Sequence, residues 1–460
     1  MLLSACSDRP TPAQPEAATS ATSFLPEQVP DHVRPGEQAF RDLARQVPAF
    51  AGFYLNGNRE LVVLLTEPSR GEAMRAALVP VLQQLAVERN NPGARIPKIV
   101  FQNAEYSFAQ LSEWRDRIAP IFDLEAVVLL DLDEQHNRLT VGLKDESGRP
   151  DVGARVRELG IPPRAVHLTV VGEPTSLAAG HTATASTSSQ GCYSLQEYCR
   201  PLIGGYQISF LQDGKQGGCT LGFGAIRNGS ELGFITNAHC SDDEWNLDYT
   251  PYYQPHNRFA QIGYESVDPR GWGFWSNCEF AYVCRDSDAN FVRTGAGVEV
   301  DVGYIARTLG GGPFYVDPAR PRLTITGTSK VYGGETVYMM GRTSGWLSGR
   351  IVKTCADIKK TWEARWHKVL CQDVHNGNID YGDSGSPVFL WNGADHITLL
   401  GVNWGRNGIT RDHTYYSPIA NIRKDLGSLE VRAPGFRTHT GGGGGGGCGG
   451  GDPTVIVEPC

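Results

Sequence analysis

The segment Gly382-Asp383-Ser384-Gly385-Ser386-Pro387 places a serine between two glycines in a tight turn. A serine held in this way can present its hydroxyl as a nucleophile, provided that a neighbouring base removes the proton. The backbone amides of Gly382 and Ser384 can also point the same way and stabilise an oxyanion, and one such donor lowers the barrier by roughly 3–4 kcal/mol. Glycine suits position 382, because a side chain there would crowd the carbonyl under attack.

Two further segments supply a base and an acid. His239 follows an apolar run in Thr236-Asn237-Ala238-His239-Cys240, and Asp288 precedes one in Asp286-Ser287-Asp288-Ala289-Asn290-Phe291-Val292. An imidazole titrates near neutrality, and a carboxylate on its second nitrogen fixes the tautomer and stabilises the imidazolium. The chain order His239, Asp288, Ser384 therefore predicts nucleophilic acyl transfer, with Asp286 as the second candidate for the acid.

The region around these segments has an all-β pattern. Short apolar runs such as 206–210 and 398–402 alternate with glycine turns, and the chain has 55 glycines. Strands at this density predict a barrel or sandwich. Residues 33–172 differ, because strand-like runs at 61–65 and 126–132 alternate with helical spacing at 73–88.

These composition changes divide the chain into five parts. They are a start and linker (1–30), an α+β domain (33–172), a second linker (173–199), the all-β domain (200–432) and a glycine-rich tail (433–460).

The cysteines predict disulfides. Cys6 stands alone, and the other ten of the eleven cysteines all lie from residue 192 onward. No Cys-x-x-Cys occurs, which argues against a zinc ribbon or a thioredoxin-type site. The close spacing predicts five pairs in an oxidising compartment: Cys192/Cys199, Cys219/Cys240, Cys278/Cys284, Cys355/Cys371 and Cys448/Cys460.

Charge and hydropathy narrow the choice of partners. The net charge is −8, with no basic block, which argues against nucleic acid. No run of about 18 apolar residues occurs, so no membrane span is predicted. We expect no metal and no cofactor.

The start of the chain resembles a bacterial lipobox. Leu3-Ser4-Ala5-Cys6 would carry a lipid on Cys6 if translation began upstream of Met1, and the alternative is a chance match of four residues. We therefore expect a secreted protein, with lipid anchoring through Cys6 left open.

The three chemistry-bearing segments resemble a known family. TNAHC, DSDANFV and GDSGSPVF are similar to the triad motifs of chymotrypsin-fold serine proteases, above all the secreted bacterial streptogrisins and α-lytic protease. The resemblance implies a double β-barrel and the triad His239, Asp288 and Ser384, and it favours Asp288 because small Ala289 follows and leads into a strand. It implies that 33–172 is a pro-region, which acts as intramolecular chaperone and inhibitor.

The same resemblance implies a substrate site. Asn378 would lie at the base of the specificity pocket, lined by Tyr381, Val402, Asn403 and Gly405, and the strand through Trp404 would pair with the substrate backbone. An asparagine offers no charge, so the expected preference is for neutral or apolar residues. Asp380 could overturn this by turning inward.

Two positions depart from the family pattern. Ser386 replaces a glycine, and Met339 stands where relatives keep an arginine that neutralises the acid beside the nucleophile. Asp383 would then pair with Arg342 or with the amine of a new N-terminus near Leu202-Ile203-Gly204-Gly205.

The sequence thus predicts a secreted, monomeric serine endopeptidase that acts on proteins or peptides. One alternative is a catalytically inactive homologue that works as a surface binding or adhesive protein. Another is a cell-surface module in which 33–172 stays as a permanent domain.

Overall fold

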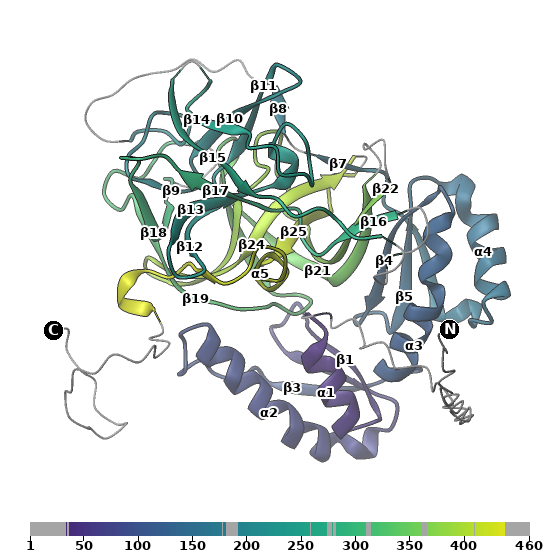
Figure 1. The fold of residues 1–460 in the computed structure, drawn as a ribbon. Coiled ribbons are helices and arrows are strands. Elements are labelled where there is room, and N and C mark those ends of the chain that lie inside the picture. The colour runs from purple at the N-terminus through teal and green to yellow at the C-terminus, as the bar shows by residue number, and fades with distance from the viewer. Residues whose placement is uncertain are drawn as a thin grey trace, which may run out of the picture. The chain divides into compact units, whose positions relative to one another are not determined.

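Helices and strands alternate up to about residue 172, and strands dominate after it (Figure 1). The protein is described here from a computed structural model. It describes residues 34, 36–176, 178–180, 192–257, 259–273, 278, 282–309, 314–360, 366–408 and 410–437. All of these belong to one compact unit that begins at Arg34.

The first part of the chain builds two small three-stranded arrangements covered by helices. β1, β2 and β3 form a separate sheet, whereas β4, β5 and β6 continue a larger one. A capping box in which Ser107 and Gln110 bond to each other's backbone N–H starts α3. The elements are α1 (Gln38–Gln46), β1 (Phe50–Leu55), β2 (Leu61–Leu65), α2 (Gly71–Glu88), β3 (Ile99–Asn103), α3 (Phe108–Ile118), β4 (Val127–Asp133), β5 (Arg138–Leu143), α4 (Arg149–Glu158) and β6 (Val166–Val170).

A nine-stranded sheet carries the histidine segment. Its order is β26-β12-β13-β17-β15-β14-β10-β11-β8. The strands are β8 (Ala179–Gly180), β10 (Gln207–Gln212), β11 (Lys215–Thr220), β12 (Phe223–Arg227), β13 (Glu231–Thr236), β14 (Pro251–Gln254), β15 (Ala260–Val267), β17 (Asn290–Thr294) and β26 (Leu429–Glu430).

A fourteen-stranded sheet carries the serine segment and, in order, runs β16-β22-β25-β24-β23-β20-β21-β4-β5-β6, with β7, β9, β18 and β19 off this path. The further elements are β7 (Pro174–Ser176), β9 (Leu202–Gly204), β16 (Tyr282–Arg285), β18 (Val300–Ala306), β19 (Arg322–Thr328), β20 (Thr336–Gly341), β21 (Gly345–Lys360), β22 (Trp366–His375), β23 (Pro387–Gly393), β24 (His396–Asn407), β25 (Thr414–Pro418) and α5 (Ile419–Leu426). The protein is therefore β-rich, and the double barrel stays a prediction.

The two parts of the chain share this larger sheet through β4 and β21. Leu130 and Leu129 pair antiparallel with Asp357 and Ile358. Ion pairs cross the same boundary: Arg34 with Asp357 at 2.7 Å, Arg89 with Glu335 at 2.8 Å and Lys353 with Asp131 at 3.1 Å. Residues 34–172 are therefore bonded to the remainder by backbone and by charge.

Four disulfides are present, at the pairs that the cysteine spacing predicts: Cys192–Cys199, Cys219–Cys240, Cys278–Cys284 and Cys355–Cys371. Cys6, Cys448 and Cys460 lie outside the described residues.

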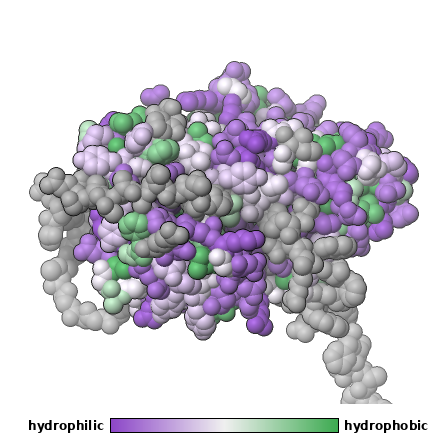
Figure 2. Space-filling model, turned by 90° about the horizontal axis from the view of Figure 1, so that it is seen from above, coloured by the Kyte–Doolittle hydropathy of each residue, from purple (hydrophilic) through white to green (hydrophobic). Residues whose placement is uncertain are grey.

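Among the described residues, no helix is both long enough and apolar enough to cross a membrane. On the face drawn in Figure 2, apolar side chains are scattered among hydrophilic ones.

Candidate active site

Three side chains from distant segments form a continuous hydrogen-bonded line. His239 lies in the short helix Ala238–Cys240 that follows β13. Asp288 lies in the turn that leads into β17, and Ser384 lies in the turn that leads into β23. The Nε2 atom of His239 is 2.8 Å from Ser384 Oγ, and its Nδ1 atom is 2.8 Å from Asp288 Oδ2. All three residues are buried. This is the geometry in which a base can activate a hydroxyl while a carboxylate orients the base.

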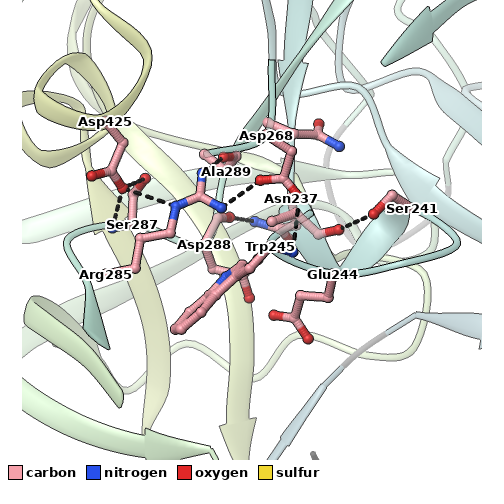
Figure 3. A network of polar contacts seen from close by, with 12 residues as sticks. Asn237, Ser241, Glu244, Trp245, Asp268, Arg285, Ser287, Asp288, Ala289 and Asp425 are labelled. Carbon is pink, nitrogen blue, oxygen red and sulfur yellow. Dashed lines mark hydrogen bonds and ion pairs between the residues drawn. The ribbon is translucent and has the colours of Figure 1, made fainter. Parts of the chain in front are cut away.

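The backbone around Asp288 is fixed on both sides. Its N–H donates to Ser417 Oγ at 2.9 Å, and its carbonyl accepts from Asn237 Nδ2 at 2.7 Å. Figure 3 shows Arg285 between Asp268 and Asp425, next to the Ala289 carbonyl that it also bonds. The turn that carries Asp288 is thus held by a buried polar network.

The charge on Asp288 is stabilised by its neighbours. Burial alone would raise its pKa, but the ammonium of Lys360 and the ring of His239 outweigh burial, so the net shift of the pKa is downward. Asp288 is therefore ionised at neutral pH, as an acid that supports an imidazolium must be.

The second candidate acid has a different partner. The Asp286 carboxylate lies 2.7 Å from Lys424 Nζ, and burial with the nearby charge of Asp425 raises its pKa to about 6. Of the two acids, the structure brings Asp288 to the histidine.

Sequence reasoning missed two charged residues at this site. Lys360 Nζ lies 2.6 Å from Asp288 Oδ2 and also bonds to Glu244. The Trp245 and Trp404 rings flank the ammonium, with centroids 5.3 and 5.6 Å from it. Neither Lys360 nor Glu244 belongs to a local motif, so nothing in the sequence pattern pointed to them.

Three side chains at this site have ligand atoms close enough together to hold a metal ion. His239, Glu244 and Asp288 offer ligand atoms within 4.8 Å of one another. The ammonium of Lys360 already bonds to both carboxylates, so the protein supplies its own cation here.

The serine turn explains the glycine at position 382. Gly382 has a φ of +96°, and a Cβ there would come within 2.3 Å of the Arg342 guanidinium. The Gly382 carbonyl accepts from Thr220 Oγ1 at 2.8 Å, and the Ser384 carbonyl accepts from Thr220 N at 2.7 Å. The turn is therefore anchored to the end of β11, and the oxyanion role of its N–H groups stays a prediction.

Asp383 is held by backbone groups. Its carboxylate accepts from the N–H groups of Thr343, Ser344 and Asp380 at 2.9, 3.2 and 2.9 Å. Arg342, one of the two expected partners, donates instead to Gln207 at 2.6 Å and acts on Asp383 only through space. The other expected partner would arise near Leu202–Gly204, which forms β9 of the continuous chain.

The expected pocket residues are divided between surface and interior. Asn378 and Tyr381 are exposed, whereas Val402, Asn403, Trp404 and Gly405 are buried. The Asn403 amide is occupied within the protein: it accepts from His375 Nε2 at 2.9 Å and donates to Ser386 Oγ at 3.0 Å. His375 is a further residue that the sequence did not indicate. The pocket assignment stays a prediction.

A segment of the chain itself pairs with both strands that hold the serine turn. Ser176 in β7 pairs with Gly405 in β24, and Ala179 and Gly180 in β8 pair with Gly218 and Gly217 in β11. The composition of this segment predicts only a linker.

Comparisons with known proteins found structural neighbours only. No family model and no curated protein matches the chain. Three of the similar solved structures are protease A of Thermobifida fusca (21% identity, TM-score 0.33), the chymotrypsin of Cellulomonas bogoriensis (22%, 0.33) and a Nocardiopsis protease (20%, 0.31). Each match covers 50% of this chain and 98% of the other. These neighbours are bacterial chymotrypsin-fold serine proteases.

Proposed function

We propose that the chain is a serine endopeptidase, and the observation that carries this proposal is the line Ser384–His239–Asp288 with its two 2.8 Å contacts. Nε2 of His239 accepts the hydroxyl proton as Ser384 Oγ bonds to the substrate carbonyl carbon. The imidazolium gives that proton to the amine as the C–N bond breaks, which leaves an acyl-enzyme. Water then attacks the ester with the same histidine as base, and Ser384 regains its proton.

The electrostatic roles follow from the same geometry. The ionised Asp288 stabilises the imidazolium that forms in each step. The N–H groups of Gly382 and Ser384 are the proposed donors to the oxyanion. An inactive homologue would have no need to keep the nucleophile, base and acid in bonding order.

We test the function with an active-site label. Ser384→Ala should abolish labelling by a fluorophosphonate and lower peptide hydrolysis by several orders of magnitude, because only the nucleophile is lost. The exposed Ser230 provides a matched control, since Ser230→Ala should keep both activities. Labelling that survives in Ser384→Ala, or its absence in the intact and proteolytically trimmed wild type, would contradict the proposal.

We further propose that residues 34–172 inhibit this site until they are removed, and that they do so through the segment that follows them, residues 174–180. Pro174–Ser176 and Ala179–Gly180 occupy strand edges on β24 and β11. Both edges bond to the serine turn, through Asn403 with Ser386 and through Thr220 with Ser384. Between Ser176 and Ala179 the chain therefore passes from the β24 edge to the β11 edge.

We propose that this segment lies along the site as a substrate would. We expect the protein to work in an oxidising, extracellular compartment, where its disulfides persist. We expect the first cut to fall at one of the bonds between Ser176 and Ala179. N-terminal sequencing of the wild type after incubation should find a new terminus at residue 177, 178 or 179, whereas Ser384→Ala stays intact. A stable, active wild type without this cut would instead favour a permanent N-terminal domain.

A further inference from the structure

Asp288 has a second cationic partner besides the histidine. Lys360 Nζ lies 2.6 Å from Oδ2, the same oxygen that contacts His239 Nδ1 at 2.8 Å. The Lys360 and Asp288 side chains are both fully buried. Charges in such surroundings are screened far less than at the surface, so this contact acts strongly on the carboxylate.

Glu244 balances the lysine. Its carboxylate bonds to the same ammonium and is only 4% exposed. The three groups together carry one negative charge, as a lone aspartate would, but spread over a larger volume. The part of the carboxylate charge that the histidine ring senses is consequently smaller.

We propose that Lys360, balanced by Glu244, is a positioning residue of the catalytic group: it fixes the Asp288 carboxylate through Oδ2 and offsets part of the negative charge that faces His239. This inference rests on the proposed function, because it concerns the same histidine. It assigns Lys360 no contact with substrate.

The surroundings of His239 define what else can influence its proton. Glu244 lies in the loop after His239, and Asp288 lies in the turn before β17. Lys360 lies at the end of β21. Behind Asp288 lies the buried pair of Arg285 with Asp268. His367 of β22 stacks on Trp245 with ring centroids 4.2 Å apart. Among these groups, Lys360 is the one that contacts Asp288 Oδ2, the oxygen that bonds the histidine.

The strand that ends at Lys360 has a partner strand on each side. Lys360 is the last residue of β21, and Asp357 and Ile358, just before it, pair with β4. Asp357 is also clamped by Arg34 at 2.7 Å and by Arg115 at 3.5 Å. Lys360 itself pairs with His367 of β22, a contact that does not involve residues 34–172.

A charge series tests the proposal in the Ser384→Ala background, where activity plays no part. The imidazole protons of His239 are followed by NMR over a pH titration. Lys360→Met should raise the histidine pKa by about one to two units, because the cation that contacts the same Asp288 oxygen as the histidine is lost. Glu244→Gln should lower it, and the double variant, which restores one net negative charge, should return to within about half a unit of the parent.

A second readout uses the active chain after it has processed itself. The acidic limb of the kcat/KM profile should move in the same directions as the NMR titration. Equal histidine pKa values in all four proteins, even with lowered kcat/KM, would show that Lys360 only fills space and would overturn the inference. If Lys360→Met does not fold, the downward shift in Glu244→Gln still decides the question. A wild type that neither hydrolyses nor labels would refute the proposed function while leaving the titration series interpretable.

Discussion

At the scale of single residues, the choice of acid is the sharpest prediction. Asp288→Asn should lower kcat by about 10⁴, because the amide favours the wrong histidine tautomer. Asp286→Asn is the matched control two positions away. Its carboxylate contacts Lys424 rather than His239, so peptide hydrolysis should stay within a few-fold of wild type. A severe loss in the control and a mild one in Asp288→Asn would reverse the assignment.

The neighbourhood of Asp380 bears on substrate preference. Its half-exposed carboxylate lies 3.2 Å from Arg406 Nη2, so it already has a cation. A substrate Lys or Arg side chain would lose water without gaining an unpaired acid. Peptides with Phe, Tyr, Leu or Met before the scissile bond should therefore be cut faster than those with Arg or Lys. A panel of chromogenic peptides that differ only at this residue measures the preference, and a clear preference for Arg would contradict it.

His375 predicts a pH effect on stability. Burial lowers its pKa to about 4, and the hydrogen bond to Asn403 offsets this only in part. In the unfolded chain His375 binds a proton near pH 6.5, whereas in the folded protein it does so only near pH 4. The free energy of unfolding is therefore unaffected by His375 above pH 6.5 and decreases as the pH falls from 6.5 towards 4. From pH 7 to pH 5 the loss amounts to about 2 kcal/mol.

Urea denaturation of Ser384→Ala with and without His375→Gln checks this effect. The free energy of unfolding should fall less between pH 7 and pH 5 in the His375→Gln variant. Equal falls in both proteins would show that His375 does not bind a proton on unfolding in this range.

At the scale of elements, the hairpin of β21 and β22 is held by Cys355–Cys371. The two cysteines are 16 positions apart, for which the chain-entropy model gives about 3 kcal/mol. Replacing both by Ala should lower the free energy of unfolding by about that amount. The Cys192–Cys199 bridge, with a separation of 7, gives about 2 kcal/mol and serves as comparison. A larger loss from the shorter loop would contradict the loop-length argument.

Whether a feature could be predicted from the sequence depends on whether its residues are close together in the chain. The His239, Asp288 and Ser384 segments each carry their own short pattern, and β2 and β4 follow from apolar runs of strand length. Lys360 and His375 carry no such pattern, because their partners Asp288 and Asn403 are distant in sequence and meet them only in the folded sheet. The pairing of Pro174–Ser176 with β24 was missed for a similar reason, since its composition is that of a linker.

At the scale of the whole molecule, Arg89 joins the two parts of the chain. Its guanidinium bonds both oxygens of Glu335 at 2.8 and 2.9 Å and also the Lys330 carbonyl. Arg89→Met leaves the nearly buried Glu335 carboxylate without its cation, which costs about 3–5 kcal/mol.

Denaturation of the intact Ser384→Ala chain measures this effect. The control is Arg70→Met, whose pair with Glu67 is exposed and contributes less than about 1 kcal/mol. Equal losses in the two variants would show that the Arg89 contact does not join the parts.

If residues 34–172 are removed as proposed, the strand pairing between β4 and β21 has a consequence for the protein that remains. The β21 backbone at Asp357 and Ile358 then becomes an open edge, able to recruit a strand from another molecule. Removal of residues 34–172 would also break the ion pairs of Lys353 with Asp131 and Asp133. Asp357 would likewise lose its ion pairs with Arg34 and Arg115. The newly bared rim consequently carries unneutralised charges of both signs, the kind of feature that keeps free edges from sticking together. In the proposed processed form, the side chains that held the N-terminal part would therefore also oppose aggregation at this edge.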